Sequence, residues 1–523
     1  MSIHKKIAKN AFYNLIIKVI AGVFAFVASV VAARFLGPDK YGVYSLVMWF
    51  LSFAGLLVNL GLPTTITKYV SEYWGRKDFS SIRSILKQLL RVELLAGLVV
   101  SLLLFFLAPF IANWYHNPDL SLYVKVASLV ILPLGLMWIY NGYFCGLQRF
   151  DLIAKVNIVV SPLTLGLILL VLYAGGKIEW LVGVSVVSNI LLVGSYLYLK
   201  KTSLTFSPES PFRHIPVDQN LDPWSKWLKF SASVFVVSLL EAVIWERFGI
   251  LFLSIFSPSS EIAFYNVAFI LSSRTMILLP GALTGILLPA ISEVYGEGNK
   301  EELARVHANS TRYLAMLSLP LCLGGIAIAK HLFPILYGVS FQPASFVFAI
   351  LLLGGTVGLI STSSSALLYG VELQKIVVGV EVLSALVNLL ASWLLVPPFG
   401  AKGAAFATTI AQLVGGLGMI IYAYKRVMKQ KFPITFIWRI FSASALMGVV
   451  GFFLIDSIKG VTGLAITLIV SLPMYIICLF FTRSFTSDDI VLLESALLRM
   501  PSAFGRIIQP AFRWLIQSFY PSR

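Results

Sequence analysis

The stretch Arg34–Gly75, RFLGPDKYGVYSLVMWFLSFAGLLVNLGLPTTITKYVSEYWG, decides how the rest of the chain is interpreted. We expect one helix to end at residues 36–38 (LGP), a tight polar turn to follow, and a second, apolar helix to begin at about Tyr44. The second helix has a weak point at Gly61 and stops at the polar SEYWG that closes the stretch. The stretch therefore predicts a helical hairpin.

A weaker copy of this hairpin lies 221 positions later, which indicates an internal repeat. At that offset four residues recur: Tyr44 as Tyr265, Glu72 as Glu293, Gly75 as Gly296 and Arg91 as Arg312. Two shorter matches extend the repeat: GLQR (146–149) resembles ELQK (372–375) at an offset of 226, and GGK (175–177) resembles GAK (400–402). The chain is therefore expected to contain two homologous halves.

The composition is that of a membrane protein, since 58% of the 523 residues are hydrophobic, 12% are charged and the mean hydropathy is +0.89. Soluble domains carry about 25% charged residues. Apolar runs of about 20 residues recur along the chain, which predicts spanning helices and excludes a β-barrel, whose strands alternate polar and apolar residues. The first run is too long for a signal-peptide core of about 7–15 residues, so we interpret it as the first helix.

Fourteen spanning helices are predicted. They cover residues 14–33, 44–66, 88–111, 121–144, 154–174, 180–199, 229–255, 264–289, 311–329, 344–369, 376–396, 402–424, 434–455 and 462–482. When the loops are assigned alternately to the two sides, the amino terminus, the even-to-odd loops and the tail hold 30 of the 40 basic residues. The opposite loops hold seven: Arg34, Lys40, Lys125, Lys177, Lys330, Lys402 and Lys459.

This bias places both termini in the cytoplasm of a multi-pass protein of the cell membrane. It also argues against nucleic acid as the partner that explains the net charge of +17. Six spans per half is an even number, so both halves start on the same side and the repeats are expected to be parallel. The predicted parts are an amino-terminal lobe (1–200), a cytoplasmic linker (201–228), a second lobe (229–426), two further helices (427–485) and a tail (486–523).

The tail begins with Ser487-Asp488-Asp489, a signature of a helix amino terminus. Ile508, Phe512, Leu515 and Phe519 then fall on one helical stripe, and arginines recur every seven residues at 499, 506 and 513. We expect an amphipathic helix on anionic lipid, with a frayed tail as the alternative. The three cysteines lie far apart in apolar runs, which excludes a disulfide framework and a CxxC metal pair.

Basic residues in or at the ends of the spans are candidates for a cationic chamber between the halves. A charge inside a span costs about 2.5 kcal/mol or more, so it needs a partner or a water-filled cavity. A lipid diphosphate or acidic sugar needs fixed positive charge, and the planar fork of arginine matches phosphate oxygens. The candidates are Lys18, Arg34, Arg91, Lys155, Arg247 and Arg274.

Each candidate has a structural alternative. Lys18, Lys155 and Arg91 can extend to the cytoplasmic interface, and Arg34 can contact outer head groups or the carbonyls at the end of its helix. Arg247 can form a structural ion pair, although its neighbour Glu246 points about 100° away around the helix. Arg274 is the strongest candidate because it is far from both ends of its predicted span.

Three acids are candidates for coupling transport to a proton or a sodium ion: Glu241, Glu246 and Glu381. Glu241 lies mid-span in SVFVVSLLEAVIWERF with no basic residue three or four positions away. Burial favours the protonated form of such a group, which suits a coupling role. The alternative is a protonated, hydrogen-bonded structural residue. No metal site and no cofactor other than such an ion are expected.

The motifs together resemble the polysaccharide-transport family of the multidrug/oligosaccharidyl-lipid/polysaccharide (MOP) exporter superfamily. They are Arg34 with LGP (36–38) and Tyr41-Gly42, Ser71-Glu72, Glu246-Arg247, AFYNVA (263–268) and PAISE (289–293). The resemblance implies an all-α membrane protein with two six-helix bundles of the MATE/MOP kind plus two carboxy-terminal helices. Two departures, Glu246 where an aspartate is usual and Phe264 where a glycine is usual, leave the substrate open.

The resemblance also implies a Wzx-type flippase, a transporter and not an enzyme, that moves a polyprenyl-(di)phosphate-linked oligosaccharide by alternating access for polysaccharide biosynthesis. Its partners would be the lipid-linked glycan, membrane lipids, and a glycan polymerase and glycosyltransferases. One alternative is a cation-coupled drug or metabolite antiporter of the same superfamily, which is expected to have an acidic and aromatic cavity. Another is a multi-span polymerase or glycosyltransferase, although the predicted external loops are short and lack a DxD-like or His-rich cluster.

Overall fold

A computed structural model describes residues 3–204, 224–245, 248–278, 287–288, 291–292, 294–458, 460–486 and 489–490. The predicted inter-lobe linker lies mostly outside these ranges, and so do Glu246, Arg247, Glu293 and almost all of the predicted tail. Every regular element within the described ranges is a helix. The expectation of an all-helical protein is therefore confirmed for this part of the chain.

Ten of the described helices are long and apolar enough to cross a membrane, which agrees with a multi-pass membrane protein. Two of the ten elements are bent into two arms, α1 at Gly37 and α13 at Gly400. The count of fourteen spans stays a prediction.

The amino-terminal helices are α1 (Ile3–Asn59), α2 (Leu62–Gly75), α3 (Phe79–Trp114), α4 (Asp119–Gly146), α5 (Phe150–Tyr173), α6 (Ile178–Leu199), the π-helical η1 (Lys200–Leu204), α7 (Trp224–Trp245), α8 (Phe248–Phe256) and α9 (Ser259–Leu278). The later ones are α11 (Lys300–Tyr337), the 3₁₀ turn η2 (Val339–Phe341), α12 (Ala344–Gly370), α13 (Gln374–Tyr422), the π-helical η3 (Ala423–Val427), α14 (Ile434–Ser457) and α15 (Gly460–Phe481).

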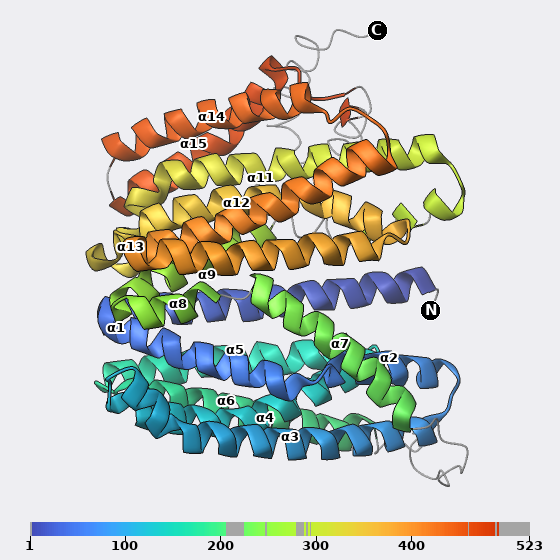
Figure 1. The fold of residues 1–523 in the computed structure, drawn as a ribbon, viewed down its shortest axis with the longest axis vertical. Helices are drawn as coiled ribbons and strands as arrows, with labels where there is room; N and C mark the ends of the chain where they lie inside the picture. Colours follow the sequence, from blue (N-terminus) through green and yellow to red (C-terminus); the bar gives the residue numbers. More distant parts are fainter. Residues whose placement is uncertain are drawn as a thin grey trace, which may run out of the picture. The chain divides into compact units, whose positions relative to one another are not determined.

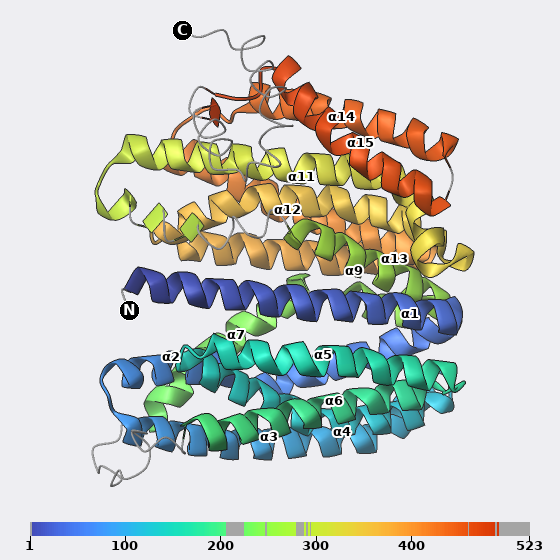
Figure 2. The same ribbon diagram turned by 180° about the vertical axis from the view of Figure 1, so that it is seen from behind.

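The chain forms two compact units, unit 1 over Met1–Asn266 and unit 2 over Val267–Arg523. In unit 1, α3 lies beside α4, and α4 lies beside α6 (Figures 1 and 2). In unit 2, α11 packs against α12 and α14, and α12 packs against α13. The predicted lobe boundaries at residues 200 and 229 stay predictions.

The hairpin that opened the sequence analysis has no polar turn, so that expectation was wrong. Gly37 has φ 70° and ψ 174°, a conformation open in practice only to glycine, and the helix resumes directly at Pro38. Proline suits the first position of a helix because its fixed φ is already helical and its missing N–H would have had no partner there. Asp39 and Lys40 are consequently helical, and one residue separates the two arms of α1.

The weak point at Gly61 is confirmed as the junction between α1 and α2. Gly61 has φ 73° and α2 begins at Leu62 with a proline in its first turn. Helix α7 crosses at this junction, where the Ser231 hydroxyl donates a hydrogen bond of 2.6 Å to the Leu60 carbonyl. A Cβ at position 61 would overlap the Ser231 carbonyl, so the close approach requires glycine, and the positive φ favours it.

The core of unit 1 gathers around α2 and the start of α7. The indole of Trp227 is fully buried and donates a hydrogen bond of 2.9 Å to the Tyr73 hydroxyl. Tyr69 stacks on Tyr73 and meets Phe230 edge-on, and Phe144 of α4 belongs to the same cluster. Buried aromatic rings contribute about 1 kcal/mol per pair beyond the area that they bury. This core holds α7 against the amino-terminal helices, although the predicted linker precedes it in sequence.

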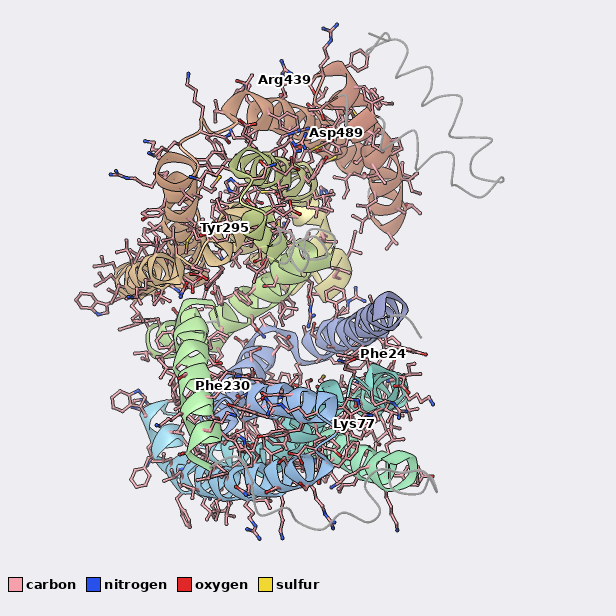
Figure 3. The ribbon with its side chains drawn as sticks, turned by 90° about the vertical axis from the view of Figure 1, so that its right-hand side faces the viewer. Phe24, Lys77, Phe230, Tyr295, Arg439 and Asp489 are labelled. Carbon is pink, nitrogen blue, oxygen red and sulfur yellow. The ribbon has the colours of Figure 1, made fainter. Side chains whose placement is uncertain are left out.

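Helices α3 and α11 begin in the same way, 221 residues apart. The residue before each cap has a positive φ, Lys77 at 59° and Gly298 at 73°. The caps are Asp78 and Asn299, whose side chains accept hydrogen bonds from the backbone N–H three residues on. Such caps satisfy a donor that the first helical turn leaves free. Figure 3 labels Lys77 in its turn.

The second repeat match had the wrong offset. The turn from α4 to α5 places Gln148 at φ 56°, and the turn from α12 to α13 places Glu372 at φ 61°. These positions differ by 224 residues and not by 226, and the starts of α5 and α13 differ by the same number. The residue with the left-handed backbone conformation, Gln148 or Glu372, determines the geometry of each turn. The similarity of GLQR to ELQK reflects side chains only and does not align these two residues.

Candidate functional site

The structure describes five of the nine predicted site residues at the level of side chains. The side chains of Lys18 and Glu241, and the whole of Glu246 and Arg247, lie outside the described residues. Arg34, Arg91 and Lys155 belong to unit 1, on α1, α3 and α5. Arg274 on α9 and Glu381 on α13 belong to unit 2.

Arg91 and Lys155 are exposed and form no hydrogen bond or ion pair within the described residues. Arg91 continues a stripe of exposed apolar side chains on α3 that includes Leu95, Leu98 and Leu102. These residues are three, four or seven positions apart and so share one face of the helix. An arginine at the end of such a face can reach lipid head groups, which favours the interfacial alternative for Arg91.

Arg274 is exposed on α9 and also forms no hydrogen bond or ion pair with the described residues. It lies in the run FILSSRTMIL, whose hydroxyl groups at Ser272 and Thr275 are hydrogen-bonded to the backbone of their own helix. Its guanidinium therefore keeps all five donors for a ligand, head group or water. Arg34 is likewise exposed at the end of the first arm of α1, and Glu381 is half-buried on α13.

A basic and aromatic surface at α2 and α7 was missed by the sequence analysis. The ammonium of Lys68 lies 3.9 Å from the ring centre of Phe230 and 5.0 Å from that of Tyr69. Lys226 lies 5.5 Å from the same Tyr69 ring. Figure 3 labels Phe230 on α7. Cations over ring faces keep a defined position, and these lie in segments that the charge bias assigns to the cytoplasmic side.

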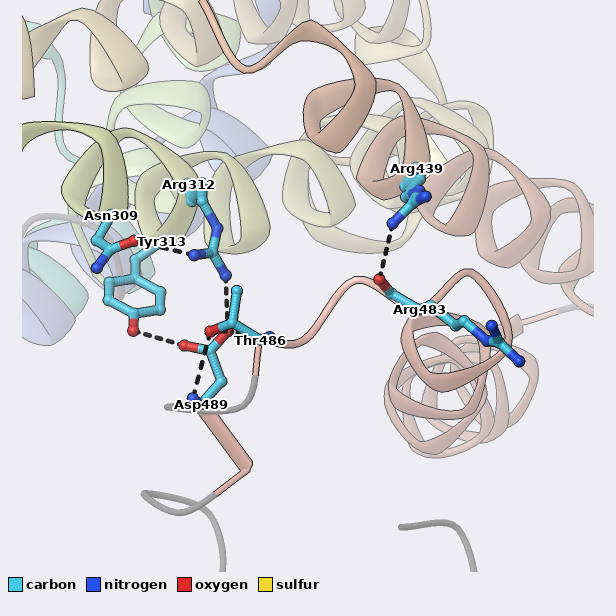
Figure 4. A network of polar contacts seen from close by, with 7 residues as sticks. All are labelled: Asn309, Arg312, Tyr313, Arg439, Arg483, Thr486 and Asp489. Carbon is cyan, nitrogen blue, oxygen red and sulfur yellow. Dashed lines mark hydrogen bonds and ion pairs between the residues drawn. The ribbon is translucent and has the colours of Figure 1, made fainter. Parts of the chain in front are cut away.

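A buried ion pair in unit 2 ties the segment after α15 to α11 (Figure 4). The Arg312 guanidinium donates a hydrogen bond of 2.6 Å to Oδ2 of Asp489, and the Tyr313 hydroxyl donates one of 2.6 Å to Oδ1. Arg312 is also 2.9 Å from Oδ1 of Asn309, and its guanidinium carbon lies 4.2 Å from the ring centre of Phe436 on α14. The pair joins residues 177 positions apart, which no local sequence pattern indicates.

Asp489 also corrects the predicted helix start at the tail. Oδ2 accepts hydrogen bonds from the backbone N–H and the hydroxyl of Thr486, and the Ile490 N–H bonds to the Thr486 carbonyl. Thr486 is therefore the cap, with Asp489 three residues on. Burial alone raises the pKa of Asp489, but the Thr486 and Tyr313 hydrogen bonds and the Arg312 charge together lower it below its usual value.

A second buried network joins α11, α12 and η3. Nε2 of His307 lies 3.1 Å from the Ser364 hydroxyl, and the Thr311 hydroxyl lies 2.8 Å from that of Ser363. The Tyr424 hydroxyl donates a hydrogen bond of 3.2 Å to Thr311, and its ring lies 4.6 Å from that of His307. The network ties the start of α11 to the ends of its neighbours. No cluster of three metal-binding side chains occurs among the described residues.

Known proteins are similar to most of the chain. The family model described as "Polysaccharide biosynthesis protein" matches residues 31–346, and that of "Lipid II flippase MurJ" matches residues 234–473. Stage V sporulation protein B of Bacillus subtilis (strain 168) is 23% identical over 92% of this chain and 95% of its own length. The probable low-salt glycan biosynthesis flippase Agl15 of Haloferax volcanii is 22% identical over 77% of this chain and 81% of its own.

The fold has a counterpart among solved structures. The lipid II flippase MurJ in an inward closed conformation aligns with a TM-score of 0.71, over 90% of this chain and 99% of that one. The two sequences are 16% identical in this alignment, so the likeness is one of fold. The polysaccharide biosynthesis model spans more than half of the chain, which is enough to establish the family.

Proposed function

The chain belongs to the polysaccharide biosynthesis protein family of Wzx/MOP-type membrane flippases, and from this membership we propose that it moves a polyprenyl-(di)phosphate-linked glycan across the cytoplasmic membrane. The match of that family over residues 31–346 carries the proposal. The names of two similar proteins, a lipid II flippase and a probable glycan biosynthesis flippase, support the class of cargo. A lipid-linked glycan keeps its tail in the bilayer while its polar head group crosses.

The proposed topology has fourteen spans with both termini in the cytoplasm. Dividing α1 and α13 at Gly37 and Gly400 turns the ten apolar elements into twelve. The remaining two would contain α7 with α8, and α9. Two parallel six-helix lobes of this kind suit alternating access, in which the lobes rock around a central site.

The cationic residues are proposed to hold the phosphate of the cargo. Arg274 supports this best, because it is exposed within an apolar helix and has no partner among the described residues. Lys18, Arg34, Lys155 and Arg247 remain candidates beside it, with Arg91 the weakest. Glu241, Glu246 and Glu381 are the proposed proton or sodium coupling residues.

Reconstituted vesicles test the proposal against its alternatives. The probe is a fluorescent lipid-linked oligosaccharide in vesicles with and without the purified protein, exposed to a membrane-impermeant quencher. The flippase predicts that head groups protected in empty vesicles become accessible in protein-containing ones. Sugar transfer in the same vesicles without head-group movement would instead favour a polymerase or glycosyltransferase and contradict the proposal.

The cargo site is tested by reversing one charge. Arg274→Glu is expected to weaken binding of a polyprenyl diphosphate to the detergent-solubilised protein about 10-fold or more, and to reduce the dependence of that binding on salt. The matched control is Arg76→Glu. Arg76 is an exposed arginine in the turn after α2, and it pairs with Glu72 at the end of that helix. Salt-sensitive binding that survives Arg274→Glu would contradict the assignment of Arg274.

A further inference from the structure

Glu93 is a fully buried carboxyl group in the middle of unit 1. It lies on α3, its side chain is 1% exposed, and neither carboxyl oxygen has a hydrogen-bond partner among the described residues. Buried carboxyl groups in proteins are nearly always hydrogen-bonded or paired with a base. Glu93 was not among the predicted coupling residues, which lie on α7 and α13 and in the segment after α7.

Helix α4 makes room for this carboxyl with a glycine. A Cβ at Gly135 would overlap Oε1 of Glu93 and would lie 3.1 Å from Cγ1 of Val58 on α1. The carboxyl therefore rests directly on the backbone of α4. Gly97, one turn along α3 from Glu93, faces the same helix, but a Cβ there would meet Cδ1 of Leu132 at 3.0 Å and no polar atom.

Among the described residues, no group forms a hydrogen bond or ion pair that would stabilise a negative charge on Glu93. Gly135, next to the carboxyl, and Val58, next to Gly135, are both uncharged. Arg91 is two residues away on α3, which puts it about 200° around the helix, and it is exposed. The described titratable groups on the helices packed against α3 make no hydrogen bond or ion pair with Glu93. They are Tyr13, Arg34, Asp39, Lys40, Tyr41 and Tyr44 on α1, Lys68, Tyr69, Glu72 and Tyr73 on α2, and Asp119, Tyr123, Lys125, Tyr140, Tyr143 and Cys145 on α4.

A carboxylate in such a place costs several kcal/mol, because it has lost its hydration and has no counter-charge. A neutral carboxyl costs far less, so the packed state of α3 against α4 requires a bound proton. Ionisation requires water at the carboxyl. The close contact with Gly135 has to loosen before water can enter, so proton binding and helix packing depend on each other.

We propose that Glu93 and Gly135 form a proton-binding site inside unit 1. The Glu93 carboxyl holds a proton while α3 rests on α4; when the contact opens, the O–H bond breaks and the proton passes to entering water. The site goes beyond the proposed flippase function, since it depends on the packing of unit 1 and on no property of the cargo. Its proposed ligand is a proton and not a metal ion, because no cluster of three metal-binding side chains occurs among the described residues.

Infrared difference spectroscopy of the purified full-length protein in detergent tests this directly. At about pH 7, well above the ordinary glutamic acid pKa of about 4.3, the wild type is expected to show a C=O band of a protonated carboxyl that Glu93→Gln lacks. The control Glu372→Gln removes an exposed carboxylate in the turn after α12 and is expected to leave that band unchanged. Identical protonated-carboxyl bands in the wild type and Glu93→Gln would overturn the proposal.

Two glycine variants keep the test decisive if Glu93→Gln does not fold. Gly135→Ala pushes the carboxyl off α4 and is expected to shift the Glu93 band or abolish it at about pH 7. Gly97→Ala adds the same methyl group at the same helix contact without touching the carboxyl, and is expected to leave the band in place. Equal effects of the two variants would show that helix spacing alone matters and would contradict a site at Glu93.

Discussion

Helices α3 and α11 begin 221 residues apart with the same kind of turn and cap, yet they bury different ionisable side chains. Both begin after a left-handed residue and a side-chain cap, and both carry an arginine at the same position, Arg91 or Arg312. Arg91 is exposed, and two residues later α3 buries Glu93 without a partner. Arg312 is 8% exposed and paired, and the residue equivalent to Glu93 is the fully buried Leu314.

The difference follows from what packs against each arginine. Arg312 can be buried because Asp489 reaches it from the segment after α15, and Phe436 of α14 covers it. Arg91 has no such partner among the described residues and is exposed. The same scaffold thus holds a structural ion pair in unit 2 and a lone carboxyl in unit 1.

The largest expected effect comes from breaking the ion pair. Asp489→Ala leaves the Arg312 guanidinium buried without its acid, which is expected to cost unit 2 about 3–5 kcal/mol of unfolding free energy. Thermal unfolding in detergent, followed by circular dichroism, measures the loss. Glu72→Ala, which removes the half-buried partner of the exposed Arg76 in unit 1, is the matched control and is expected to cost about 1 kcal/mol or less. Equal losses would contradict the contrast between the units.

Acid is expected to weaken the same contact without a mutation. The Asp489 pKa is lowered in the folded protein, so the contact contributes its full stability above the unfolded-state value of about 3.9 and loses it as the pH falls through the folded-state value. The wild type should therefore lose more stability than Asp489→Ala between about pH 5 and pH 2. Parallel unfolding curves over that range would mean that Asp489 has an ordinary pKa.

Replacing Glu93 by leucine, the residue at the equivalent position 314 of α11, is expected to stabilise unit 1. Glu93→Leu removes two buried oxygens without partners, which is expected to gain about 1–3 kcal/mol. Thermal unfolding of the variant beside that of the wild type checks the sign. A loss of more than about 1 kcal/mol would show that the carboxyl has a partner, such as a bound water, that stabilises it.

The smallest effect concerns the turns before the two helices, and it should have opposite signs in the two units. Lys77→Gly relieves a left-handed non-glycine residue and is expected to gain about 1 kcal/mol. Gly298→Ala introduces the same strain before α11 and is expected to cost about 1 kcal/mol, since its side chain would lie in open space. Effects of the same sign would break the equivalence of the turns.

The sequence was a good guide where one side chain or a local pattern decides the structure. Apolar runs predicted the helices, and Gly37 and Gly61 marked real breaks. Gly37 has a backbone conformation open in practice only to glycine, and at Gly61 the close approach of Ser231 leaves no room for a Cβ. The polar turn after Gly37 was wrong, because polar residues such as Asp39 and Lys40 are compatible with a first helical turn that proline begins. The repeat offset of 226 was wrong. It was chosen from the similarity of GLQR to ELQK, whereas the left-handed turn residues Gln148 and Glu372 are 224 positions apart.

Contacts between distant segments could not be predicted. Asp489 was expected to cap a helix, and its second role depends on Arg312, 177 residues earlier. The burial of Glu93 depends on Gly135 of another helix, and the position of Lys68 depends on Phe230 of α7. These are properties of packing, which one sequence without its relatives does not contain. The predicted cation and acid candidates share no local pattern that separates a cavity wall from a lipid-facing surface.

The most direct measurement of the proposed function offers two cargoes to the same protein. Vesicles containing the purified protein are loaded with a fluorescent polyprenyl-diphosphate-linked oligosaccharide and a cationic dye, and the movement of each is followed under an imposed pH or sodium gradient. We predict that the glycan head group changes sides only in protein-containing vesicles, while the dye stays where it was loaded. Movement of the dye without movement of the glycan would contradict the flippase and favour the drug antiporter.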